Sequence, residues 1–438
     1  MGVRVLPQHL TITGALAVAL CLVALLGAAG SRQAYALEEV YMPGQVIVKL
    51  DPVIGATIEE INADYGTTTL DDTLGNKGIY LLTKPDNSEG EETFAERLTK
   101  DPHKRVLYAE PNFVAETPED PAGDARMRAH GISDHRKRSS DSYAAENLGL
   151  PCAAEISRGE GTTVAILDTG AQLDHPALRG NFRGVPRYDF VGNDTNPSEP
   201  RRRPGNLVGH GTHVAGIVDR VAPAAKIMPL RVLNAQGSGD VYTIARAISF
   251  AQPHEADVIN LSLGTSSHSK LLEEMIKDAI DDDVVVVAAA GNSNTDTPHY
   301  PAAGEEILPV ASSDGLVAVT SVVPYVDENG DEFDKKSWFA NYGFWVDIAA
   351  PGERIRSAFP VDQYANWSGT SMATPFVSGQ AALIHITDGS LDPVGIETKI
   401  HDTDRRFEFS HNDLGETWTI PGQLGTGYAN VCASLSEP

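Results

Sequence analysis

From residue 163 onward, short apolar runs rich in β-branched residues alternate with amphipathic stretches of helical length. Continuous apolar runs are typical of strands buried on both faces, and the amphipathic stretches predict helices. We expect strands at 163–167, 226–233, 257–263, 284–290 and 316–322, and helices at 212–219, 241–251, 271–282 and 371–386. This alternation predicts an α/β fold, with a doubly wound and mostly parallel sheet covered on both faces.

A second, shorter pattern occupies residues 40–115. Apolar alternation predicts strands at 45–50, 78–82 and 106–109, and amphipathic periodicity predicts helices at 54–65 and 91–99. Strands and helices that alternate on so short a segment indicate a small α+β domain with its helices on one face of the sheet.

Residues 1–36 have the pattern of an export signal. Arg4 precedes an apolar run at 14–29 that is short for a membrane span, and small residues at Ala34 and Ala36 suit a signal peptidase. We expect cleavage after Ala36; an uncleaved anchor is the alternative. Because no later stretch is apolar enough to span a bilayer, we expect a secreted mature protein with no membrane segment.

The segment 116–142 is rich in Pro, Gly, Ser and charged residues and has no periodicity, which predicts a linker. Flexible polar segments are where proteolysis concentrates, so we expect conversion to a mature form within it. The sequence does not indicate which peptide bond is cleaved. The domains are therefore expected at 37–115 and 143–438, on either side of this linker.

The net charge of −26 excludes extensive nucleic-acid binding, because no basic surface is large enough to neutralise a phosphate backbone. The two short basic runs at 136–138 and 201–203 are expected in exposed loops.

Candidate chemistry centres on Ser371, at the junction of an irregular segment and a helix. A helix N-terminus has unpaired N–H groups, so a serine there can attack a carbonyl while its own N–H holds the developing oxyanion. Pro375 is expected in the first turn, where a missing N–H costs little. A base is available at His210, which opens another helix, and an orienting carboxylate at Asp168, which ends a strand.

These three segments occur in the order Asp, His, Ser, and from about residue 145 to 435 the chain resembles the subtilisin-like serine proteases. The resemblance implies a serine endopeptidase with Asp168, His210 and Ser371 as its catalytic triad and no cofactor needed for catalysis. It also implies that the side-chain amide of Asn292 completes the oxyanion hole. His213, one turn beyond His210, is expected to pack or to form a hydrogen bond.

The same resemblance implies polypeptide substrates held in extended form. Ser262, Leu263 and Gly264 are similar to the strand edge that pairs with the substrate backbone, and Gly239 is similar to the opposite wall. His299 corresponds to the floor of the pocket before the scissile bond, where relatives often have a small residue. We expect this histidine to fill space, to be able to carry charge and to disfavour large aromatic side chains.

Residues 37–115 resemble the inhibitory propeptide of this family, with 108–112 similar to its last strand. We therefore expect the chain's own propeptide to act as an intramolecular inhibitor. An unrelated accessory domain is the alternative.

The resemblance leaves a structural calcium possible, but no metal ligand set is predicted. Relatives hold a structural calcium with an acidic residue where Ala177 stands and with a loop after the catalytic histidine, and both are missing here. The acidic stretch 327–331 has alternating oxygen ligands but lacks the full calcium-loop pattern, so a solvated turn is expected. Cys152 and Cys432 remain after signal removal, and we expect them to form one disulfide; two free thiols are the alternative.

Three functions remain open from the sequence. The first is a secreted, self-processing, monomeric endopeptidase of broad specificity. The second is a dedicated processing protease of narrow specificity, although the additional β-domain typical of that branch is not expected because 425–430 already resembles the end of the catalytic domain. The third is a binding protein without activity, which the intact set of Asp168, His210, Asn292 and Ser371 disfavours.

Overall fold

The computed structural model describes residues 40–86, 88–119, 125–133, 142–200, 206–304, 314–326, 332–402, 410–411, 417–418 and 422–436, all within the unit 39–438. The predicted export signal, the two basic runs and the acidic turn at 327–331 lie outside these residues. Within the described ranges, none of the helices combines the length and the apolar character needed to cross a membrane.

The N-terminal part is an antiparallel sheet in the order β2-β3-β1-β4, with α2 and α3 packed on one face. Its elements are β1 (Tyr41–Leu50), α2 (Ile58–Tyr65), β2 (Thr68–Asp71), β3 (Ile79–Thr83), α3 (Glu91–Thr99) and β4 (Val106–Glu116). Thr57 caps α2 in a capping box with Glu60, which explains why this helix begins four residues later than predicted. The hydrophobic pattern does not predict β2 because none of its four residues is buried.

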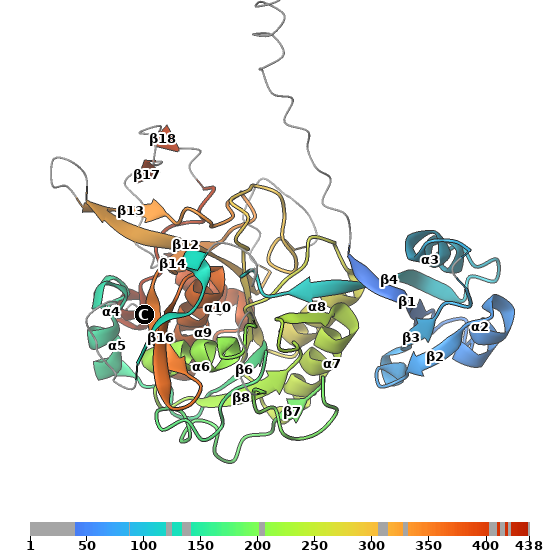
Figure 1. Ribbon diagram of the computed structural model, residues 1–438, viewed down its shortest axis with the longest axis horizontal. Coiled ribbons are helices and arrows are strands. Elements are labelled where there is room, and N and C mark those ends of the chain that lie inside the picture. The colour runs from blue at the N-terminus through green and yellow to red at the C-terminus, as the bar shows by residue number, and fades with distance from the viewer. Residues whose placement is uncertain are drawn as a thin grey trace, which may run out of the picture. The chain divides into compact units, whose positions relative to one another are not determined.

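The main sheet has the order β13-β12-β11-β10-β6-β8-β7, with β14 paired to β12 (Figure 1). Its strands are β6 (Thr163–Asp168), β7 (Tyr188–Asp189), β8 (Lys226–Arg231), β10 (Val258–Leu261), β11 (Val285–Ala289), β12 (Leu316–Val326), β13 (Glu332–Lys336) and β14 (Ile348–Pro351). Every pair is parallel except β12 with β13.

Helices cover both faces of this sheet. They are α6 (His210–Val221), α7 (Val241–Ala251), α8 (Lys270–Asp281), α9 (Thr370–Thr387) and α10 (Pro393–Asp402). Val164 and Ile166 of β6 belong to the core formed with α6 and α9, whereas the alternate residues Ala165 and Leu167 belong to the core formed with α7 and α8. This alternation confirms the predicted doubly wound, mostly parallel α/β fold.

The predicted linker 116–142 is more ordered than its composition indicates. Strand β4 continues to Glu116, and β5 (His130–Ser133) pairs with β16 (Gln363–Trp367), which is also paired with β15 (Ile355–Phe359). A four-residue edge strand has too few positions for a hydrophobic period, so partner strands far along the chain determine its structure.

Pro375 lies deeper in its helix than predicted. It is the sixth residue of α9, beyond the first turn, so its missing N–H leaves the Ser371 carbonyl without its helical partner. The Ser262 hydroxyl donates a hydrogen bond to that carbonyl at 3.1 Å. The expectation that the proline lies in the first turn is wrong, and a side chain from the segment after β10 (Val258–Leu261) replaces the lost bond.

Helices α6 and α9, which begin at His210 and at Thr370, pack closely against each other, and this packing determines their separation. A Cβ at Gly379 of α9 would lie 2.6 Å from the Cβ of Val221 on α6, closer than two carbon atoms can approach. Only glycine therefore allows this approach of the two helices.

Cys152 on α5 (Leu150–Ile156) and Cys432 on α11 (Val431–Ser436) form a disulfide with a Cα–Cα distance of 5.6 Å and a sequence separation of 280 residues. It joins the beginning of the catalytic part to its last described helix. A cross-link over so long a loop limits the freedom of the unfolded chain.

We predict that replacing both cysteines by alanine lowers the free energy of unfolding by about 2–5 kcal/mol. The measurement is urea unfolding in a Ser371→Ala background with and without reductant, and reductant should affect only the chain that retains both cysteines. Two alkylatable thiols in the unreduced protein would contradict the disulfide.

Candidate active site

Asp168 and His210 meet where a strand ends and a helix begins. Asp168 is the last residue of β6, and His210 is the first residue of α6. Both Asp168 carboxylate oxygens accept from His210 Nδ1, at 2.8 and 2.9 Å, and both side chains are fully buried. Gly209 precedes the histidine with φ +105°, and a Cβ there would collide with Phe359, so only glycine suits this entry into the helix.

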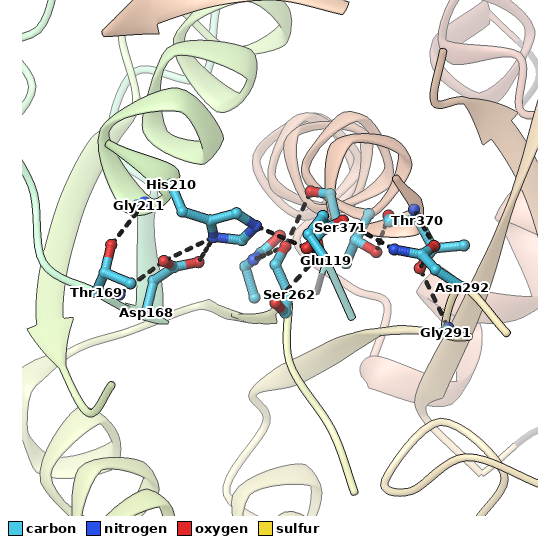
Figure 2. A network of polar contacts seen from close by, with 12 residues as sticks. Glu119, Asp168, Thr169, His210, Gly211, Ser262, Gly291, Asn292, Thr370 and Ser371 are labelled. Atoms are coloured by element: carbon cyan, nitrogen blue, oxygen red, sulfur yellow. Dashed lines mark hydrogen bonds and ion pairs between the residues drawn. The ribbon is translucent and has the colours of Figure 1, made fainter. Parts of the chain in front are cut away.

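Ser371 and Asn292 approach from the other side (Figure 2). Ser371 lies in the first turn of α9, and Asn292 follows β11. Both the backbone N–H and the hydroxyl of Thr370 donate to Asn292 Oδ1, at 2.9 and 3.0 Å. These two bonds fix the orientation of the amide, so its Nδ2 points toward Ser371.

A fifth residue, Glu119, joins these groups. Figure 2 shows its carboxylate between His210, Ser371 and Asn292. Ser371 Oγ donates to Glu119 Oε2 at 2.8 Å, and Asn292 Nδ2 donates to Glu119 Oε1 at 3.0 Å. His210 Nε2 lies 3.1 Å from the same Oε2. The serine and the histidine therefore both contact one carboxylate oxygen.

This carboxylate changes the charge of the site. Burial opposes the charged imidazole, but Asp168 and then Glu119 outweigh burial and raise the pKa of His210 to about 10. Glu119 itself is only 1% exposed, so its negative charge is removed from water and depends on these partners. This arrangement therefore favours the charged form of the His210 imidazole at neutral pH.

The backbone before Glu119 lies between the two segments predicted to hold a substrate, at Gly239 and at 262–264. Strand β4 pairs antiparallel with β9 (Ser238–Asp240), with Ala115 opposite the predicted wall residue Gly239. Glu116 and Gly264 exchange two backbone hydrogen bonds of 2.9 Å each. The chain's own segment thus forms the extended strand expected of a bound peptide.

The remaining residues predicted to line the substrate pocket are Leu263, Ser262 and His299. Leu263 is fully buried in the core, and Ser262 supports α9. His299 packs against Gly264, where a Cβ would collide with its ring. Burial lowers the pKa of His299 to about 4, so the expectation that it can carry charge near neutral pH is wrong.

His213 is buried as expected. Its Nε2 lies 3.1 Å from the carbonyl oxygen of Ala365, and burial lowers its pKa to about 3. It therefore remains neutral and structural.

Sequence reasoning missed two glutamates, Glu119 and Glu199, that contact the candidate residues or their neighbours. Glu199 Oε1 accepts from the Thr169 hydroxyl at 2.5 Å and from the Gly209 N–H at 2.7 Å, and Oε2 accepts from the Thr212 hydroxyl. It joins the residue after Asp168 to the residue before His210, although burial raises its pKa to about 7. Neither glutamate belongs to a periodic pattern or a motif, so no local signal identifies it.

Comparison with known proteins identifies the family of the chain. The subtilase family, peptidase S8, matches residues 159–417, and the fervidolysin N-terminal prodomain family matches residues 28–112. The thermophilic serine proteinase of Bacillus sp. (strain AK1) is 34% identical over 360 residues, 78% of each chain. Thermitase of Thermoactinomyces vulgaris is 40% identical over 256 residues, 56% of this chain and 82% of thermitase.

The fold is also similar to the crystal structure of fervidolysin from Fervidobacterium pennivorans, with a TM-score of 0.71 and 23% identity. That alignment covers 91% of this chain and 61% of fervidolysin, and at this identity it supports the fold alone. The family matches confirm the resemblance recognised in the sequence. The chain belongs to the subtilase family of serine endopeptidases and carries a fervidolysin-like N-terminal prodomain.

Proposed function

We propose that this subtilase is a secreted endopeptidase made as a self-processing zymogen, with Asp168, His210 and Ser371 as its triad. The observation that carries the proposal is the convergence of His210, Ser371 and Asn292 on a single carboxylate, that of Glu119. An amide that donates to a carboxylate oxygen beside the Ser371 hydroxyl is placed to donate to the oxyanion that forms when this hydroxyl attacks a carbonyl. Secretion is supported by the signal-like pattern of 1–36 and by the disulfide.

In the proposed reaction, neutral His210 takes the proton of the Ser371 hydroxyl as its oxygen attacks the scissile carbonyl. The Asn292 amide and the Ser371 N–H bind the oxyanion. Asp168 holds the histidine by Nδ1 and stabilises the imidazolium that forms. The histidine then gives its proton to the leaving amine, and water hydrolyses the acyl-enzyme by the same steps in reverse.

The arrangement with Glu119 in place is an inhibited one for two reasons. Its carboxylate occupies the position that a substrate's oxyanion needs. It also helps keep His210 protonated, and an imidazolium cannot accept the serine proton. Release of Glu119 is therefore required before the linker, which is tethered and present at high effective concentration, can become the first substrate.

Replacing Ser371 by alanine is expected to leave a precursor in which residues 37 to about 140 remain attached. Asp168→Asn should slow conversion without preventing folding, because it disturbs the histidine tautomer rather than the packing. The measurement is the mass of each purified protein from a host that lacks other secreted proteases. Recovery of a trimmed Ser371→Ala chain would mean that another protease performs the conversion, and self-processing would be rejected.

A histidine titration tests the charge argument. In the Ser371→Ala precursor we expect His210 to lose its proton near pH 10, and at a clearly lower pH after Glu119→Gln. The pKa of His210 in the folded chain is raised above the unfolded value of about 6.5. The stabilisation that the charged histidine gives the folded state is therefore complete below about pH 6.5 and is lost as pH rises through about 10. The measurement is the chemical shift of the His210 ring by NMR.

Glu116→Gln is the matched control, since that side chain lies three residues earlier and is exposed. It should leave the titration unchanged. Equal His210 titration in the Glu119→Gln and Glu116→Gln precursors would show that Glu119 does not hold the proton on the histidine.

A further inference from the structure

Three potential ligand side chains gather at a place that shares no residue with the cleft. Asp347 directly precedes β14 (Ile348–Pro351), and Glu397 and His401 lie one turn apart on α10 (Pro393–Asp402). One donor atom from each lies within 4.8 Å of the others. We call these residues the Asp347 cluster.

Two atoms of the cluster are buried without a hydrogen-bond partner. The Glu397 side chain is 0% exposed and that of His401 is 10% exposed. Glu397 Oε2 accepts from the Gly315 N–H at 2.7 Å, but Oε1 and His401 Nε2 have no hydrogen-bond partner in the described part of the chain. They face each other at 3.9 Å, too far for a hydrogen bond. Buried polar atoms rarely stay unpaired, so their orientation points to a missing ligand.

The charges of the cluster also call for a cation. Asp347 and Glu397 bring two carboxylates together, and among the described residues no lysine or arginine forms an ion pair with either. Burial and the repulsion between acidic neighbours raise the pKa of both groups, to about 8 for Glu397, so without a cation these acids favour their protonated forms. A divalent cation would neutralise both and leave His401 as a neutral nitrogen ligand.

The donor set selects the kind of cation. Calcium and magnesium prefer oxygen ligands alone, whereas zinc combines imidazole nitrogen with carboxylate oxygen. Zinc bonds of about 2.0–2.2 Å in a tetrahedral site separate ligand atoms by roughly 3.4 Å, close to the spacing between Glu397 and His401. In each carboxyl group a backbone N–H binds one oxygen and leaves the other for the metal. The Gly315 N–H donates to Glu397 Oε2, and the Ala318 N–H donates to Asp347 Oδ2 at 2.6 Å. Such outer contacts orient metal ligands.

We propose that Asp347, Glu397 and His401 bind one zinc ion, which ties α10 to the sheet where β14 begins. Three protein ligands leave the fourth position of the tetrahedron to water, and the ion would link elements fifty residues apart without touching the cleft. The proposal is independent of the peptidase mechanism.

The test uses the full-length Ser371→Ala chain, which cannot digest itself. After a chelator has removed metals, the protein is titrated with zinc chloride, and in a parallel arm with calcium chloride. Elemental analysis gives the metal bound per chain, and thermal unfolding gives the change in midpoint. We expect one zinc per chain at this site and a higher midpoint, with no competition from calcium.

His401→Ala and Glu397→Gln are each expected to weaken that zinc site by at least about a hundredfold and to abolish the zinc-dependent midpoint shift. The second variant keeps the size of the side chain, so it remains informative if the first folds poorly. His385→Ala is the matched control, because His385 Nε2 lies 3.3 Å from a single carboxylate, that of Asp257, and has no third ligand. Absence of bound zinc, or equal zinc binding by His401→Ala and His385→Ala, would overturn the proposal.

Discussion

The packing of α6 against α9 is the constraint on which the rest of the active site depends. His210 is the first residue of α6 and Ser371 lies in the first turn of α9, so the separation of the two reactive side chains follows from how closely the helices pack. Gly379 allows Val221 to approach it, and the Ser262 hydroxyl completes α9 where Pro375 cannot. A larger residue at 379 would move the serine relative to the histidine without touching either.

The position of Glu119 follows from backbone pairing rather than from its own side chain. Residues 115–117 form backbone hydrogen bonds with residues 237–240 on one side and Gly264 on the other. This pairing places Glu119, two residues further on, beside His210 and Ser371. The buried carboxylate is stabilised only while His210 is charged and while Ser371 and Asn292 donate to it. Removing one partner of a buried ion pair costs about 3–5 kcal/mol, so this arrangement depends strongly on a few contacts. The groups that hold the inhibitor are those that we propose for the reaction.

The sequence predicts the fold well, and the choice of candidate catalytic residues likewise depends on local signals. Asp168, His210, Asn292 and Ser371 each stand at the end of a strand or the beginning of a helix, within short motifs. Glu119 and Glu199 could not be predicted, since each reaches the site from a loop whose path depends on partners far along the chain. β2 and β5 were missed because they bury too little apolar surface to produce a period.

The sequence does not predict the Asp347 cluster, for a related reason. Glu397 and His401 have helical spacing, but spacing of this kind is common on exposed helices. Only the tertiary structure brings Asp347 beside them and buries their facing atoms. The protonation state of His299 could not be predicted from the sequence either, because it depends on burial of the side chain.

The most direct test of the account is the initial rate at which a fluorophosphonate labels Ser371 in precursors that all carry Asp168→Asn, which slows self-processing and so preserves the unprocessed chain. Glu119→Ala should be labelled about ten- to hundredfold faster than the unmodified precursor, because a hydrogen bond to a charged group contributes about 1.5–3 kcal/mol. Glu116→Ala should match the unmodified precursor, and Ser371→Ala should not be labelled. Equal labelling of the Glu119→Ala and unmodified precursors would contradict the claim that this carboxylate blocks the catalytic serine.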